Sequence, residues 1–105
     1  MKDEVFYGKS MQRVKDDNEE LYQAIVDINN AVWDGKALDY KTQKLIAIGI
    51  AASNSDTRAI KKQMESAKKE LGITRDEILD VLKVVLLTSG MPPFNKSLSV
   101  LNEVF

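Results

Sequence analysis

The chain of 105 residues contains no cysteine and no histidine. The missing thiol excludes disulfides, thiol redox chemistry and a nucleophilic cysteine, and the missing imidazole excludes histidine acid–base catalysis. Zinc or iron sites built from either residue type are excluded for the same reason. Glycine-rich phosphate loops and acidic calcium-binding loops are absent as well. We therefore expect no cofactor and no metal ion, since only oxygen ligands would be available.

Charge of one sign and long apolar runs are also missing. The 15 basic residues are spread among 16 acidic ones, which gives a formal net charge of −1. This balance offers no basic stripe for a phosphate backbone, so a nucleic-acid partner is not expected. The longest apolar runs, 45–52 and 84–87, fall far short of the roughly 20 residues that span a bilayer. We expect a cytoplasmic protein without a membrane partner.

Hydrophobic residues make up 44% of the chain, and glycine and proline together contribute only seven residues. This composition is typical of one compact, helix-rich domain, here residues 1–105. The pattern TRDE at 74–77 is a capping box and predicts a helix over about 75–88. Gly72 closes the preceding helix, which Ser55 or Asp56 caps at its start. Further helices are predicted over residues 18–33, 39–52 and 94–104, with a short leading helix within 4–17, which gives an all-α bundle of five to six helices.

Two of these helices, 39–52 and 75–88, are apolar on nearly every side. Such helices are expected to be buried all round. A chain of this length has little room to enclose both, and surplus apolar surface must then meet another subunit. We predict an obligate homo-oligomer.

Three segments resemble the carboxymuconolactone decarboxylase and alkylhydroperoxidase D-like family: ALDYKTQKLIAIGIAAS, ITRDEILDVLKVV and SGMPPFNKSL. The family pattern runs L-D-x-K-T-[KR]-E-L-I-A-L-A, then C-x-x-C-x-x-x-H, then G-[AV]-[ST]-x-[ED]-E-I and a late G-x-P. The resemblance covers roughly residues 38–98. It implies an all-helical fold and assembly into trimers, hexamers or related rings. It also implies either peroxide reduction through two cysteines or decarboxylation of a muconolactone.

The residues that carry the family's redox chemistry differ in this chain. Counting back from Gly72, Met64 takes the place of the histidine, and Ile60 and Thr57 take the places of the two cysteines. Lys44 stands where the family has its glutamate. A lone hydroxyl stays protonated without a base, and a thioether cannot relay a proton. The four candidate site residues therefore argue against thiol peroxidase activity.

Two interpretations of these four residues stay open. In one, Thr57, Ile60 and Met64 share a helix face and pack in the core that fills a former redox pocket. In the other, Ile60 and Met64 line a small apolar cavity that binds a hydrophobic or carboxylated ligand beside Lys44. Lys44 itself is expected to be solvated among its polar neighbours, with a desolvated, reactive amine as the alternative.

Three functions are consistent with this sequence. The first is a structural or small-ligand-binding oligomer that is linked to peroxide and oxygen detoxification only by resemblance. The second is a non-thiol enzyme of the decarboxylase branch that acts on a small carboxylated or lactone substrate, with Lys44, Thr57 or Asp56 in polar roles. The third is a subunit that works in peroxide defence with a cysteine-bearing paralogue.

Overall fold

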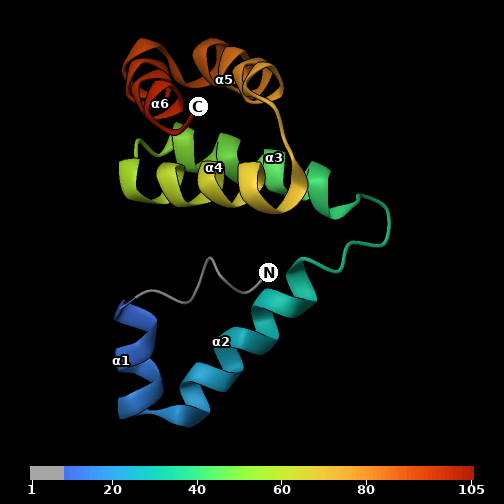
Figure 1. The fold of residues 1–105 in the computed structure, drawn as a ribbon, viewed down its shortest axis with the longest axis vertical. Helices are drawn as coiled ribbons and strands as arrows, with labels where there is room; N and C mark the ends of the chain where they lie inside the picture. Colours follow the sequence, from blue (N-terminus) through green and yellow to red (C-terminus); the bar gives the residue numbers. More distant parts are fainter. Residues whose placement is uncertain (1–8) are drawn as a thin grey trace. The chain divides into compact units, whose positions relative to one another are not determined.

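A computed structural model describes residues 9–105 (Figure 1). Over this range the chain forms six helices and no strand, which confirms the predicted all-α fold. None of these helices is long and apolar enough to cross a membrane. The helices are α1 (Lys9–Asp17), α2 (Glu19–Val32), α3 (Tyr40–Ser53), α4 (Thr57–Leu71), α5 (Arg75–Ser89) and α6 (Met91–Val104). The predicted leading helix corresponds to α1, and its expected first residues lie outside the described range.

The chain divides into two compact units, one that ends at Tyr40 and one that spans Lys41–Phe105. In the first unit, α1 packs against α2, and the side chain of Asn18 caps α2 by accepting a 3.0 Å hydrogen bond from the backbone N–H of Leu21. Near the end of α2, the indole Nε1 of Trp33 donates a 2.7 Å hydrogen bond to the buried Oδ1 of Asn29. The prediction of a single domain stays a prediction.

Helix α2 leaves much of its apolar side exposed. Its sequence repeats large aliphatic residues at helical spacing, a pattern typical of a helix that packs on a partner surface. The side chains of Leu21, Ile28 and Val32 are nevertheless about half exposed or more. The packing within the first unit therefore does not use this face of α2.

The ends of the helices in the second unit follow the capping signals. Asp56 caps α4, because its side chain accepts a hydrogen bond from Ala59 N–H, and Gly72 closes α4 with a φ of 60°. The capping box between Thr74 and Glu77 is present at the start of α5, as predicted. Helix α6 begins at Met91, three residues before the predicted start, because two prolines fit the first helical turn, where their missing N–H groups are not needed.

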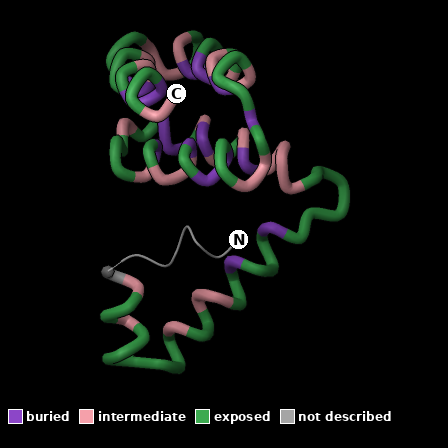
Figure 2. Tube along the Cα trace, in the orientation of Figure 1, coloured by how far each residue is buried: buried purple, intermediate pink, exposed green. Residues whose placement is uncertain are grey.

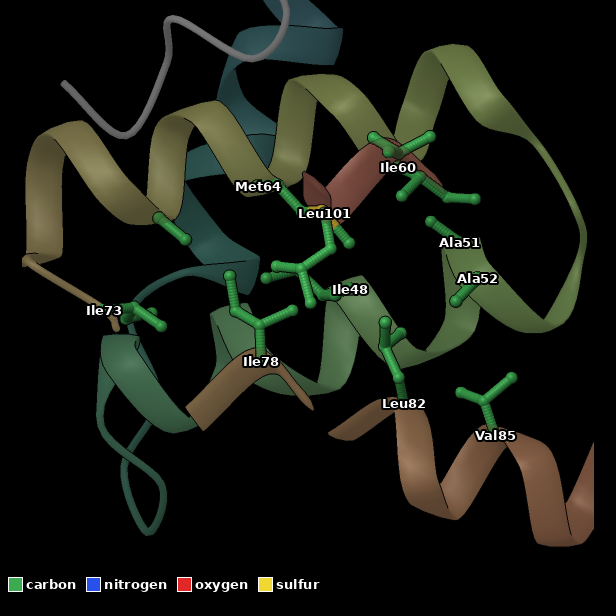
Figure 3. Close-up of a cluster of buried hydrophobic side chains, with 12 residues drawn as sticks. Ile48, Ala51, Ala52, Ile60, Met64, Ile73, Ile78, Leu82, Val85 and Leu101 are labelled. Carbon is green, nitrogen blue, oxygen red and sulfur yellow. The ribbon is translucent and has the colours of Figure 1, made fainter. Parts of the chain in front are cut away.

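The core of the second unit lies between two helix layers (Figures 1 and 2). Helices α3 and α4 form one layer, and α5 and α6 form the other. The buried side chains of all four helices meet in one apolar cluster (Figure 3). Its largest fully buried hydrophobic members are Ile48, Ile60, Met64, Ile73, Ile78, Leu82 and Leu101.

The outer faces of α3 and α5 remain exposed in the single chain. Ile46 and Ile50 on α3 are 46% and 59% exposed, and Val84 and Leu87 on α5 are 60% and 87% exposed. The expectation that both helices are buried all round is therefore wrong for the second unit by itself. Each helix has only one neighbouring layer, which covers one face and leaves the other to solvent.

Candidate functional site

Two of the four candidate residues, Ile60 and Met64, lie in the core. Both side chains extend from α4 into the apolar cluster and are completely buried (Figure 3). Thr57 is different, because it is the first residue of α4 and is exposed. The prediction of a shared core face is thus confirmed for Ile60 and Met64 and wrong for Thr57. The reason is that α4 begins in the polar link after α3, at the surface of the unit.

Lys44 is completely buried, which corrects the expectation of a solvated lysine. It precedes Ile48 by one helical turn, and the buried positions of α3 recur at steps of four, seven and eight residues from Lys44. The residue therefore lies on the face of α3 that packs into the core. Its Nζ atom donates a 2.9 Å hydrogen bond to Oε1 of Gln63 on α4.

A polar stripe on α4 surrounds this hydrogen bond. Gln63, Ser66 and Glu70 are spaced i, i+3 and i+7, which places them along one side of the helix. Ser66 is buried, and its Oγ atom donates a 3.2 Å hydrogen bond to Oε2 of Glu70. Gln63 and Glu70 are half-buried. We refer to Lys44, Gln63, Ser66 and Glu70 as the Lys44 cluster.

Burial lowers the pKa of the Lys44 amine from its ordinary value of 10.5, because the charged form loses its hydration. The negative charge of Glu70 opposes this effect and raises the pKa in part. Desolvation is the larger of the two causes. A lysine in this setting can hold a carboxylate as an ammonium ion or act as a nucleophile in its neutral form.

Sequence reasoning found Lys44 but missed the three polar residues of α4 that accompany it. The signal for its burial was available, because Lys44 continues the apolar spacing of Ile48, Ala51 and Ala52. The stripe of Gln63, Ser66 and Glu70 was also present beside Met64, but it resembled an ordinary solvated face. Within residues 9–105, no three histidine, cysteine, aspartate or glutamate side chains are grouped so that they could hold a metal ion.

An apolar groove lies elsewhere, between α3 and α5, with a volume of about 380 Å³. Gly49 contributes to the lining, and a Cβ atom at this position would lie 3.3 Å from Cγ1 of Val81. Lys44, Ile60 and Met64 do not line this groove. We call it the α3/α5 groove, and its lining residues are Thr42, Leu45, Ile46, Gly49, Ile50, Ser53, Val81, Val84, Val85 and Thr88.

Comparison with known proteins identifies the family. The model of the carboxymuconolactone decarboxylase family matches residues 19–103, which is most of the chain. The chain belongs to the carboxymuconolactone decarboxylase family. The resemblance stated from the sequence motifs is thereby confirmed, and this family member lacks both the C-x-x-C pair and the histidine.

Two relatives come from Methanocaldococcus jannaschii. The uncharacterized protein MJ0742 is 61% identical over 104 residues, which cover 99% of this chain and all of the relative. The uncharacterized protein MJ1511 is 36% identical over 97 residues, which cover 92% of this chain and 90% of the relative. Both alignments extend over nearly the whole of each chain, so the similarity is not confined to one short motif.

The reactive positions of the carboxymuconolactone decarboxylase family pattern lie on α3 and α4 of this chain. The position of the second cysteine is the buried Ile60, and the histidine position is the buried Met64. The glutamate position is Lys44, whose hydrogen bond ties α3 to α4. In this family member, an apolar core and a desolvated lysine thus occupy the region where the pattern has its redox residues.

Proposed function

We propose that this chain is a structural oligomer of the carboxymuconolactone decarboxylase family without thiol peroxidase activity. The observation that supports the proposal is the burial of Ile60 and Met64 in an apolar cluster. Thiol peroxidation needs a reactive thiolate with access to the peroxide and a group that moves protons. Two apolar side chains in the core supply neither, and the carboxylate next to Thr57, that of Asp56, already accepts a hydrogen bond from Ala59 N–H as the cap of α4.

The test is hydroperoxide consumption with a dithiol reductant. We expect the rate with the purified chain to equal the rate with reductant alone. The Lys44→Met variant, purified in the same way, is the control for contaminating peroxidases, because a contaminant would give equal activity in both preparations. Activity that co-elutes with the chain and is lost in Lys44→Met would contradict the proposal.

A second function is favoured by the Lys44 cluster. Burial lowers the pKa of Lys44, so its amine loses a proton more readily than that of a solvated lysine. Such an amine suits a non-thiol enzyme of the decarboxylase branch that binds the carboxylate of a small acid. Because Lys44 is completely buried, this function requires the helices to open around the amine. Gln63 would hold the amine in position through the 2.9 Å hydrogen bond.

Thermal denaturation with small carboxylates and lactones distinguishes the two functions. A ligand at 100 times its dissociation constant stabilises the folded state by about 2.7 kcal/mol, which raises the melting temperature by several degrees. We expect no shift for a purely structural oligomer. A shift that is lost in Lys44→Met and kept in Lys83→Met, a change at an exposed lysine of α5, would support the second function.

A further inference from the structure

The Lys44 cluster lies at the open end of the helix pair formed by α3 and α4. Lys44 is the fifth residue of α3, and Glu70 is the next-to-last residue of α4. The link between the two helices, residues 54–56, is at the opposite end of the pair. Along the polar stripe Ser66 is buried and Glu70 is half-buried. The stripe therefore ends, near the end of α4, in a carboxylate that is in contact with water.

The charges around the Lys44 amine identify Glu70 as its counter-charge. The negative charge of Glu70 acts on the amine across the two helices. Lys41, three residues before Lys44 on α3, instead forms a 2.8 Å ion pair with Glu77 of α5. The Oγ atom of Ser66 donates a 3.2 Å hydrogen bond to the Glu70 carboxylate and holds it in place. The fold thus supplies the buried amine with a carboxylate of its own.

A carboxylate within the chain competes with any carboxylate that comes from solution. Because Glu70 is attached to the same fold, its effective concentration near Lys44 is far above that of a dissolved acid. An incoming carboxylate has to displace Glu70 or bind beside it, and two like charges at close range repel each other. The affinity of the Lys44 cluster for acids therefore depends on Glu70 as well as on Lys44.

The apolar neighbours of the cluster define the class of acid. Ile48 follows Lys44 by one helical turn, and Met64 comes directly after Gln63 on α4. Both side chains are completely buried. A second charged group on the ligand would lose its hydration among such residues without gaining a partner. The cluster therefore suits a small monocarboxylate with a short apolar tail better than a dicarboxylate.

We propose that Glu70 is a built-in competitor, which occupies the Lys44 amine and must be displaced before a small monocarboxylate can bind there. This inference rests on the second proposed function, the binding of a small acid by Lys44, and adds the residue that controls it. Removing the negative charge of Glu70 should convert a weak site into a stronger one. If Glu70 only supported the site, its removal would have the opposite effect and weaken binding.

The first experiment measures the dissociation constant of propionate for the full chain by isothermal titration calorimetry, with sodium chloride as the control for ionic strength. Glu70→Gln removes the charge and keeps a side-chain oxygen that can accept the hydrogen bond from Ser66. We expect this variant to bind propionate at least about 10-fold more tightly than the wild type. Propionamide, which has a similar shape and no charge, should bind to neither protein.

Two variants serve as controls. Glu65→Gln makes the same change at an exposed position of α4 and should leave the dissociation constant within about two-fold of the wild-type value. Lys44→Met combined with Glu70→Gln should abolish binding, because the amine is then missing. Far-UV circular dichroism checks that each variant is folded.

The second experiment observes the displacement of Glu70 in the wild-type chain. Protein labelled with ¹³C at lysine Cε and glutamate Cδ is titrated with propionate and followed by NMR spectroscopy. The spectra of Lys44→Met and Glu70→Gln assign the two signals of interest. We expect both signals of the wild type to shift with the same dissociation constant, since the ligand replaces one residue at the other.

The possible failures of this inference and of the second proposed function are distinct. Equal or weaker binding of propionate by Glu70→Gln than by the wild type would overturn this inference and leave acid binding at Lys44 intact. A Lys44 signal that shifts while the Glu70 signal stays in place would have the same meaning. Propionate that binds to neither the wild type nor Glu70→Gln would instead contradict the second proposed function, and this inference with it.

Discussion

The Nζ atom of Lys44 and the Oε1 atom of Gln63 are 2.9 Å apart, and their hydrogen bond joins α3 to α4 at a point where the lysine is completely sealed from water. Burying a charged amine is costly even when it is paired, and aliphatic replacements of buried ionic groups often leave proteins equally stable or more stable. Loss of hydration at Lys44 is therefore a cost to the fold that the attraction of Glu70 offsets only in part. Such a residue is a good candidate for a functional role.

The first prediction concerns stability and pH at Lys44. At pH 7 we expect Lys44→Met to be more stable than the wild type by about 1–3 kcal/mol, because the methionine fills the site without charge and the desolvation of the Lys44 amine outweighs its attraction to Glu70. Burial lowers the folded-state pKa of Lys44 below the ordinary 10.5. Between these two pKa values the unfolded chain binds more protons, so the stability of the wild type rises with pH. The advantage of the variant should therefore shrink towards pH 10.5, as measured by urea denaturation.

Lys83→Met is the control for this series. Lys83 is exposed and forms an ion pair with Asp80 on the same helix. Exposed pairs of this kind contribute little, so the variant should differ from the wild type by less than about 0.5 kcal/mol. A difference between the wild type and Lys44→Met that stays constant from pH 7 to pH 10.5 would contradict the assigned burial effect.

Restoring the family's histidine at position 64 should destabilise the protein. Met64 is completely buried among aliphatic side chains, where an imidazole would lose hydration. We expect Met64→His to lower the free energy of unfolding by about 2–4 kcal/mol. Met64→Leu conserves volume and polarity, and it should cost less than about 1.5 kcal/mol. Urea denaturation of the two variants in parallel gives the comparison, and equal losses would show that packing shape and not polarity decides the cost.

Two threonines at helix starts should differ in their importance. Thr74 supplies the capping box of α5, since its Oγ1 accepts a 3.2 Å hydrogen bond from the backbone N–H of Glu77. Thr74→Ala should cost about 1 kcal/mol. Thr57 is exposed and follows Asp56, which already caps α4, so Thr57→Ala should cost less than about 0.5 kcal/mol. Thermal denaturation of the two variants measures both losses. If Thr57 had a structural role, Thr57→Ala would lose more stability than Thr74→Ala.

The contact between Gly49 and Val81 should appear as energetic coupling. Alanine is favoured over glycine in a helix interior by about 1 kcal/mol, but its Cβ would lie only 3.3 Å from Cγ1 of Val81. Gly49→Ala should therefore be more favourable in a Val81→Ala background than in the wild type, by about 0.5–1 kcal/mol. A double-mutant cycle in urea measures this difference. Strict additivity would mean that Val81 moves away at no cost.

Much of this fold is predictable because its signals are local. The capping box at Thr74 and the glycine at the end of α4 depend only on neighbours in the sequence, so the helix ends they define match the structure. The start of α6 differs by three residues, because Pro92 and Pro93 fit inside the first turn as well as before it. Burial of α3 and α5 was overestimated, since hydrophobic content does not tell how many neighbouring layers a helix has.

The candidate site was predictable in position but not in character. Family spacing led to Ile60, Met64 and Lys44, and all three are buried. The identity of the residue gave the wrong expectation for Lys44, because lysine is usually solvated, whereas its spacing from Ile48 indicated the core. The partners Gln63 and Glu70 come from another helix. Such pairings across elements become apparent only when the chain is folded.

The links within the second unit have a consequence for how the chain reaches its fold. Three residues connect α3 to α4, three connect α4 to α5, and Gly90 alone separates α5 from α6. Each helix can thus meet its neighbour after the closure of a very short loop, which costs little chain entropy. Proteins rich in such local contacts fold within microseconds to milliseconds. The apolar cluster between the two helix layers would then form early, while the chain is still short of its final packing.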